Sequence, residues 1–139
     1  MSLFTSETVI KAPFFDIDPM GVVWHGNYIK YMEIARCDMF SKLNYTYMDM
    51  KNDNYTYPIA KMETKFIEPV QFDQEIMAVT VLEEIEPAIK IKYLFKDKKT
   101  NKKLFKATTL QIAVDIKTKT SLYEAPEKLK KILKEKNEK

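Results

Sequence analysis

The spacing of apolar residues changes twice along this chain, and each change predicts a different kind of element. Residues 3–14 alternate imperfectly between apolar and polar, which predicts a first strand. From Asn27 to about Leu43, apolar residues recur at three- and four-residue steps, which is typical of a helix with one apolar face, N-capped by Gly26 or Asn27. That face comprises Tyr28, Tyr31, Met32, Ala35, Met39 and Phe40.

After a polar loop that is rich in Tyr and Asn and runs through Asn54, the apolar period drops to two. Four strands are predicted there, over residues 58–69, 75–85, 88–96 and 103–116. In the last of these strands, the residues at alternate positions on one face are Leu104, Thr108, Leu110, Ile112, Val114 and Ile116. The connections are too short for crossover helices, so neighbouring strands should run antiparallel. A C-terminal helix should begin at Pro126 and carry a narrow apolar stripe of Leu129, Ile132 and Leu133.

These elements predict an α+β fold. An antiparallel sheet with one wet face must bury the other face, and the long helix can cover it. At 139 residues the chain is expected to form a single domain over residues 1–139. A domain of this size keeps much of its surface wet, so a second subunit is expected to complete part of the sheet and helix surface.

Composition removes several classes of function. With only Gly21 and Gly26, neither a glycine-rich phosphate loop nor a nucleophile elbow can be written. One histidine, His25, and one cysteine, Cys37, argue against a zinc site. The net charge of +3 and the lack of a basic stripe argue against nucleic-acid binding. The lone cysteine fits a reducing compartment, and neither a signal peptide nor a membrane span is recognisable, so we expect a cytoplasmic protein.

One segment is informative as a unit. Residues 15–28 read Phe-Asp-Ile-Asp-Pro-Met-Gly-Val-Val-Trp-His-Gly-Asn-Tyr, and Glu-Ile-Ala-Arg follows at residues 33–36. This string resembles the hotdog-fold thioesterases typified by 4-hydroxybenzoyl-CoA thioesterase and by the acyl-CoA thioesterases associated with the Tol–Pal system. Residues 69–76 resemble the strand-to-strand corner of the same family. The resemblance implies a hotdog fold, in which an antiparallel sheet wraps around one long central helix, here followed by a C-terminal helix.

The resemblance also implies an activity. By position, the family's catalytic carboxylate is Asp18, and its central helix starts near Gly26–Tyr28 and points its N-terminus at the thioester carbonyl. The implied substrates are acyl-CoA thioesters, hydrolysed without a metal or bound cofactor by homodimers that often pair into homotetramers. One departure is the acidic stretch at residues 83–87, where the aromatic-substrate member carries a basic cluster for the CoA nucleotide. Delivery of the acyl group by an acyl carrier protein therefore remains open.

The chemistry of the segment fits thioester hydrolysis. Asp18 opens an Asp-Pro-Met-Gly sequence with the signature of a type I turn, from which it could attack the thioester carbon or deprotonate a water. His25 could orient water or bond the carboxylate or the thioester, or it could be an ordinary loop histidine. Backbone amides of residues 24–28 are candidates for stabilising the oxyanion. The expected substrate-binding residues are Trp24, Gly26, Asn27 and Tyr28.

Other polar residues near the segment are expected to be structural. Asp16 should bond loop amides, Glu33 and Arg36 should form an ion pair three residues apart, and Cys37 should be buried as a small hydrophobe. Two other functions fit the same fold. One is a non-catalytic module that binds acyl-CoA or an acyl carrier protein, and the other is a hotdog dehydratase or hydratase. The second relies on a different arrangement of a histidine and an acid on the helix, whereas His25 precedes it.

Overall fold

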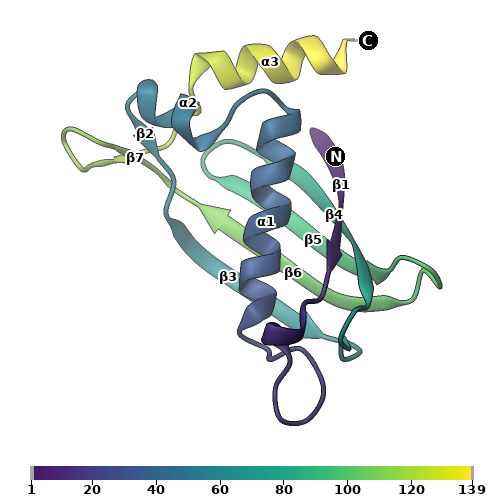
Figure 1. Ribbon diagram of the computed structural model, residues 1–139. Helices are drawn as coiled ribbons and strands as arrows, with labels where there is room; N and C mark the ends of the chain where they lie inside the picture. Colours follow the sequence, from purple (N-terminus) through teal and green to yellow (C-terminus); the bar gives the residue numbers. More distant parts are fainter. Residues whose placement is uncertain (1, 139) are drawn as a thin grey trace.

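A five-stranded antiparallel sheet is covered by one long helix in the computed structural model, which describes residues 2–138 (Figure 1). The strands are β1 (Phe4–Lys11), β3 (Ile59–Phe66), β4 (Glu75–Glu84), β5 (Ile89–Asp97) and β6 (Lys103–Gln111). Their order across the sheet is β1-β4-β5-β6-β3, and every neighbouring pair is antiparallel. The predicted α+β class, with four antiparallel strands after the helix, is confirmed.

Helix α1 (Asn27–Lys42) packs its predicted apolar face against the sheet. All six residues predicted for that face are at most 3% exposed. Because side chains alternate between the two faces of a strand, every second residue of β4 and β5 meets the helix. These buried residues are Ile76, Ala78, Thr80 and Leu82 on β4, and Ile89, Ile91, Tyr93 and Phe95 on β5.

From Phe105 onward, strand β6 buries the parity that its aliphatic pattern does not mark. Its inward side chains are Phe105, Ala107, Thr109 and Gln111, whereas Thr108 and Leu110 lie half-buried on the outer face. Leu104, of the marked parity, is also buried. The ring of Phe105 fills the centre of the helix–sheet interface, where it contacts the rings of Tyr28, Phe66 and Phe95. Aliphatic residues lie on both faces of this sheet, so their alternation alone does not identify the inner one.

Strand β3 forms an open edge of the sheet. It pairs with β6 on one side only, and seven of its eight residues are exposed. The predicted strand over residues 58–69 is therefore present, and it lies beside β6, the last strand of the main sheet in sequence, rather than beside its successor β4. Met62, Thr64 and Phe66 share the inner face with Thr109, Ala107 and Phe105 of β6, and Lys61, Glu63 and Lys65 face outward.

The loop predicted to run through Asn54 was only partly right. It contains a short helix, α2 (Tyr47–Asn52), which begins with a capping box between Thr46 and Asp49. The chain then enters a small sheet of β2 (Tyr55–Thr56), β7 (Ala113–Asp115) and β8 (Ser121–Leu122). The strand predicted over residues 103–116 is thus divided between β6 in the main sheet and β7 in this small one.

Helix α3 (Glu127–Asn137) closes the end of the fold where α1 ends (Figure 1). Pro126 is its N-cap rather than its first residue, one position from the prediction. Leu129 and Leu133 of the predicted stripe are buried, and Ile132 is half-buried. Among residues 2–138, no helix combines the length and the apolar character that crossing a membrane requires.

Candidate active site

The segment before α1 is tied to the sheet by backbone hydrogen bonds. A short 3-10 helix, η1 (Phe14–Asp16), leads into the loop of residues 17–26. The Val23 amide donates to the Val70 carbonyl at 2.7 Å, and Val22 forms an isolated antiparallel bridge with Gln71. These bonds hold the loop against the connection between β3 and β4, so two segments far apart in sequence form one wall.

Asp18 occupies the predicted turn. The Gly21 amide donates to the Asp18 carbonyl at 3.0 Å, which closes the turn, and Gly21 has a φ of +83° that only glycine adopts without strain. The Oδ1 atom of Asp18 accepts from the Met20 amide at 2.8 Å and from the Val22 amide at 3.5 Å. Its Oδ2 atom has no donor among the described residues, so one carboxylate oxygen holds the turn and the other is free to react.

A shallow pocket of about 300 Å³ surrounds this carboxylate. We call it the Asp18 pocket. It is lined by Asp18, Val22, Val23, His25, Tyr28, Phe66, Ile67, Glu68 and Pro69. The ring of Phe66 meets the rings of His25 and Tyr28 edge-on, with centroids 6.4 and 5.0 Å apart. The structure therefore brings Asp18 and His25 together with Tyr28, in the first turn of α1, at one cavity that opens to solvent.

Among the amides of residues 24–28, at the start of α1, two are unpaired. The amides of Trp24, Asn27 and Tyr28 already donate to the carbonyls of Asp16, Trp24 and His25. Those of His25 and Gly26 find no acceptor within residues 2–138. Since unpaired amides at a helix N-terminus carry partial positive charge, these two are the ones that can bind a developing oxyanion. Of the five amides proposed from the sequence as oxyanion donors, those of residues 24–28, two therefore remain as candidates.

Trp24, Gly26 and Asn27 lie beside the Asp18 pocket rather than in its lining. The Trp24 indole packs over Gly26, where a Cβ atom would fall 2.1 Å from the indole Cζ3. Gly26 is the N-cap of α1, and no side chain caps this helix end. The prediction of Gly26 or Asn27 as the N-cap is confirmed for Gly26, whereas Asn27 is the first helical residue and its side-chain amide donates to the Asp16 carbonyl at 3.1 Å.

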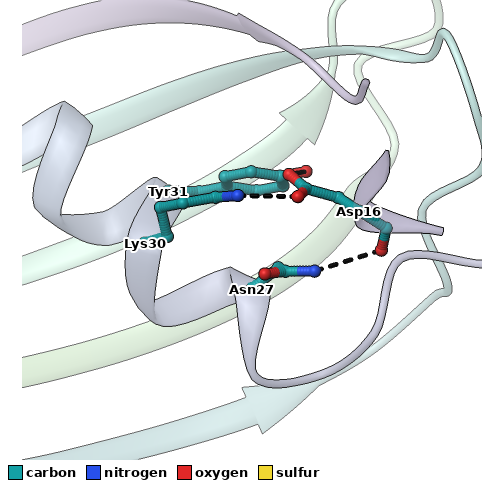
Figure 2. A network of polar contacts seen from close by, with 4 residues as sticks. All are labelled: Asp16, Asn27, Lys30 and Tyr31. Atoms are coloured by element: carbon teal, nitrogen blue, oxygen red, sulfur yellow. Dashed lines mark hydrogen bonds and ion pairs between the residues drawn. The ribbon is translucent and has the colours of Figure 1, made fainter. Parts of the chain in front are cut away.

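Asp16 is the buried anchor of the loop, and it is only 3% exposed (Figure 2). Its carboxylate accepts from the Lys30 ammonium at 2.6 Å and from the Tyr31 hydroxyl at 2.7 Å. The prediction that its side chain bonds loop amides was wrong, since both partners of the carboxylate lie on α1, and the loop amide of Trp24 bonds the Asp16 carbonyl instead. Burial alone would raise the pKa of Asp16, but the two donors outweigh it and hold this pKa below its usual value.

Replacing Asp16 with asparagine should destabilise the fold at neutral pH by about 1.5–3 kcal/mol, the range for hydrogen bonds to a charged group. An aspartate whose pKa is lowered by folding stabilises the protein above its unfolded pKa, and this contribution is lost as pH falls through the folded pKa. The difference in unfolding free energy between wild type and Asp16→Asn should therefore shrink below about pH 4. Urea unfolding between pH 3 and 7 measures it, with Tyr31→Phe removing one donor alone. A difference that stays constant with pH would contradict this account.

Arg36 does not pair with Glu33. Its Nε donates to the Tyr47 hydroxyl at 2.8 Å, and one terminal nitrogen donates to the Tyr93 hydroxyl at 3.1 Å. Arg36 is 7% exposed, whereas Glu33 points to solvent. Spacing on a helix permits the predicted ion pair. The guanidinium instead turns toward the sheet, where two tyrosine hydroxyl oxygens accept its hydrogen bonds. Cys37, predicted to be buried, is exposed.

The sequence profile of the thioesterase-like superfamily matches residues 13–133. The chain belongs to this superfamily. The match takes in the motif, α1 and the whole main sheet except β1, so the family predicted from residues 15–36 is confirmed.

Comparison with individual proteins identifies the fold. The acyl-CoA thioesterase YbgC of Helicobacter pylori is 33% identical over 70 residues, and the chain spans about half the length of this relative, since the match takes in 50% of each protein. The DHNA-CoA thioesterase structure from Staphylococcus aureus superposes with a TM-score of 0.85, at 23% identity over 96% of this chain and 91% of that one. An Asp-to-Asn variant of 4-hydroxybenzoyl-CoA thioesterase, complexed with its substrate, gives 0.81 at 14% identity over 93% and 98%. The predicted hotdog fold is confirmed.

One wall of the Asp18 pocket was not predicted from the sequence as part of the site. Phe66, Ile67, Glu68 and Pro69 form one wall, although they lie some 40 residues beyond the motif. The strand pattern of residues 58–69 and the resemblance of residues 69–76 to the family's strand-to-strand corner pointed to this segment, but neither says that it meets the motif. Glu68 adds a second carboxylate to the lining, and it is held by an ion pair with Lys102 at 3.1 Å.

Proposed function

We propose that this protein hydrolyses acyl-CoA thioesters to the free acid and CoA at the Asp18 pocket. The observation that carries the proposal is the free Oδ2 of Asp18 in one pocket with the start of α1, where the His25 and Gly26 amides are unpaired. A thioester carbonyl placed there has a carboxylate for its carbon and backbone donors for its oxygen. Each well-placed donor to an oxyanion contributes about 2.7–4 kcal/mol to transition-state stabilisation.

Two routes lead to the same products. In the first, Asp18 Oδ2 attacks the thioester carbon, the C–S bond breaks, CoA leaves as a thiolate, and water then hydrolyses the mixed anhydride. In the second, Asp18 takes a proton from water, the resulting hydroxide attacks, and the thiolate leaves and is protonated. His25 lines the pocket and is the group we assign to orienting water or protonating the thiolate. We assign no resident metal or cofactor, and we place the reaction in the cytoplasm.

The alternative substrate is an acyl group delivered by an acyl carrier protein, and the basic outer face of the sheet favours it. Lys65, Lys92, Lys103 and Lys106 line a broad cavity of about 540 Å³ on the outer face of the sheet. The acidic stretch of residues 83–87 offers no cation to a CoA nucleotide, and Glu83 is itself paired with Lys92 at 3.4 Å. An acidic carrier would find complementary charge on the outer face.

A panel of acyl-CoAs of graded length, with an aryl-CoA and an acyl carrier protein thioester, tests the function by release of free thiol. Turnover of CoA substrates supports the main proposal, and turnover of the carrier thioester alone supports the alternative. Tight binding of acyl-CoA without thiol release would instead identify a non-catalytic binding module.

The active unit is proposed to be at least a dimer, paired through the free edge of β3. The other edge strand, β1, is partly blocked, because Lys42 donates to the Glu7 carbonyl at 2.6 Å and Asn137 donates to the Leu3 carbonyl at 3.2 Å. Two copies of β3 can extend the sheet with the same face inward only if outward residues oppose outward residues. Two such registers bring opposite charges together, with Lys61 opposite the partner's Glu63 or Glu63 opposite the partner's Lys65.

Glu63→Lys should weaken the dimer about tenfold at low salt, because it places like charges opposite each other in both registers. Sedimentation equilibrium measures the change. Adding Lys61→Glu restores pairing in the first register, and adding Lys65→Glu restores it in the second. Glu7→Lys on β1 is the matched control and should leave association unchanged. Equal dimerisation of wild type and Glu63→Lys would rule out this edge.

A further inference from the structure

The most exposed large apolar side chains of residues 2–138 lie on the loops at one end of the main sheet. Met20, Phe15 and Phe14 are 85%, 81% and 73% exposed, and the loop of residues 17–26, which carries Met20, projects beyond the sheet (Figure 1). The Phe14 ring meets the ring of Phe72 edge-on, with centroids 5.5 Å apart. We call these four residues the apolar end. Apolar surface gathered in this way marks a site of association with a protein or a membrane.

Three connections between strands meet at the apolar end. The Asp73 amide donates to the Ala12 carbonyl at 2.9 Å, so the chain that enters β4 lies beside the chain that leaves β1. The Lys98 amide donates to the Glu75 carbonyl at 3.0 Å, which places the turn between β5 and β6 beside the same segment. The aromatic rings of the apolar end are therefore flanked by the turn of residues 98–102.

These rings stay uncovered in the dimer proposed above. β1 and β4 lie on the other side of the sheet from β3, whose free edge pairs with the partner. Phe14 and Phe15 follow β1, and Phe72 precedes β4, so all three lie away from that edge. They also stand on loops rather than in a groove or along a strand edge, where a protein segment usually binds. The partner that suits them is one into which projecting side chains can insert.

Unpaired positive charge lies beside the apolar end. Most acids around it are neutralised by lysines at 2.6–3.8 Å, in the pairs Asp16–Lys30, Glu68–Lys102, Asp73–Lys11 and Glu75–Lys98. Two acids there lack a cation, Asp18 in its pocket and Asp97 at the turn. Within the described chain, five lysines near this end of the sheet have no ion pair, namely Lys65, Lys96, Lys99, Lys103 and Lys106. Cations are therefore in excess.

We propose that the apolar end docks on the surface of an anionic phospholipid bilayer. The side chains of Phe14, Phe15, Met20 and Phe72 enter the boundary between headgroups and acyl chains, and the unpaired lysines lie at the headgroups. A bilayer surface matches both features, because its interior accepts apolar side chains and its anionic lipids attract cations. No helix crosses the membrane in this arrangement, and the contact is reversible.

Docking does not depend on the thioesterase activity, but it would bear on the substrate if the proposed function holds. The Asp18 pocket opens at the same end, between the loop of residues 17–26 and Phe66–Pro69. A docked molecule would hold this pocket at the bilayer surface, where long-chain acyl thioesters partition because each buried CH₂ group favours the membrane. Since β3 pairing is antiparallel, the two apolar ends of the dimer lie at opposite ends, and one copy docks at a time.

Cosedimentation of the full chain with vesicles, without any thioester present, tests the docking. The wild type should bind vesicles of phosphatidylglycerol and phosphatidylcholine in equal parts at least about fivefold better than vesicles of phosphatidylcholine alone. Phe15→Ser combined with Phe72→Ser should lower binding about tenfold, because two rings no longer enter the bilayer. Met20→Ser makes the same test if that pair does not fold. Met48→Ser combined with Tyr123→Ser is the matched control, since both side chains are exposed at the opposite end, and it should change binding less than about twofold.

Charge reversal tests the lysines separately. Lys99→Glu should weaken binding to the anionic vesicles at low salt about fivefold or more. Lys131→Glu, on the exposed side of α3, changes the net charge equally and should have less effect. Equal losses in Lys99→Glu and Lys131→Glu, or no binding of the wild type to anionic vesicles, would overturn the proposal. So would a fall in the protein's own association, measured by sedimentation equilibrium without lipid, in Phe15→Ser combined with Phe72→Ser, since a second copy would then cover the apolar end. Loss of thioesterase activity with intact vesicle binding would refute only the proposed function.

Discussion

Asp18→Asn is expected to lower kcat for thioester hydrolysis by about 10²–10⁴-fold, the range for removing a general base. The asparagine oxygen can still accept from the Met20 and Val22 amides, so the turn keeps its shape. Its NH₂ group replaces the Oδ2 atom, which has no donor among the described residues and is the one available for chemistry. An amide neither attacks a thioester nor takes a proton at neutral pH, so the loss should appear in kcat with little change in KM.

Initial rates of thiol release measure this loss, and thermal unfolding checks that the variant is folded. Asp97→Asn is the matched control, because the Asp97 Oδ1 also accepts from two backbone amides, those of Lys99 and Thr100, at the turn between β5 and β6. It should retain the wild-type rate. Wild-type turnover by Asp18→Asn would remove Asp18 from the mechanism and leave His25 or Glu68 as the acid–base group of the pocket.

Phe105→Ala is expected to destabilise the protein by about 3–5 kcal/mol, the usual cost of deleting a buried aromatic ring. Phe105 is fully buried between α1 and the sheet, where it contacts the rings of Tyr28, Phe66 and Phe95. Those neighbours come from α1, β3 and β5, so relaxation of one element cannot fill the cavity. Since small domains are stable by only about 5–15 kcal/mol, the loss is a large part of the total.

Urea unfolding followed by tryptophan fluorescence measures this change. Phe72→Ala is a suitable control, because Phe72 is 54% exposed, and such a surface change should stay within about 0.5 kcal/mol. Tyr28 and Phe66 also line the Asp18 pocket, so Phe105→Ala should raise KM even at temperatures where the variant is folded. A loss of stability below about 1 kcal/mol would contradict the central place assigned to this ring.

The main helix was predictable because its signal is local. Apolar residues at three- and four-residue steps define a face that must be buried, whatever covers it, and the whole predicted face of α1 is buried. The turn at Asp18 followed from the same kind of evidence, since Asp, Pro and Gly each favour particular positions of a four-residue turn. The α2 capping box was also written in the sequence, at Thr46 and Asp49, and was missed among the polar residues around it.

Two of the failed predictions concern which of several permitted partners a residue takes. Arg36 was within reach of Glu33, yet it bonds Tyr47 and Tyr93. Asp16 was within reach of loop amides, yet it bonds Lys30 and Tyr31 on α1 (Figure 2). Geometry along the chain permits such contacts but does not rank them, because the competing partners arrive from other elements during folding.

The sequence by itself determined the long helix, the main strands, the fold class and the motif that carries the carboxylate, because these depend on residue type and short-range spacing. Tertiary structure alone decided that the end of β3 forms the second wall of the Asp18 pocket and that, of the amides of residues 24–28, only those of His25 and Gly26 are unpaired within residues 2–138. It also decided that β1 and β3 are the two edge strands, with side chains of Lys42 and Asn137 partly blocking β1. The physical reason is that strand order and side-chain partners are settled by burial and hydrogen bonding between distant segments. Several arrangements satisfy the same local pattern, and packing of the whole chain selects one.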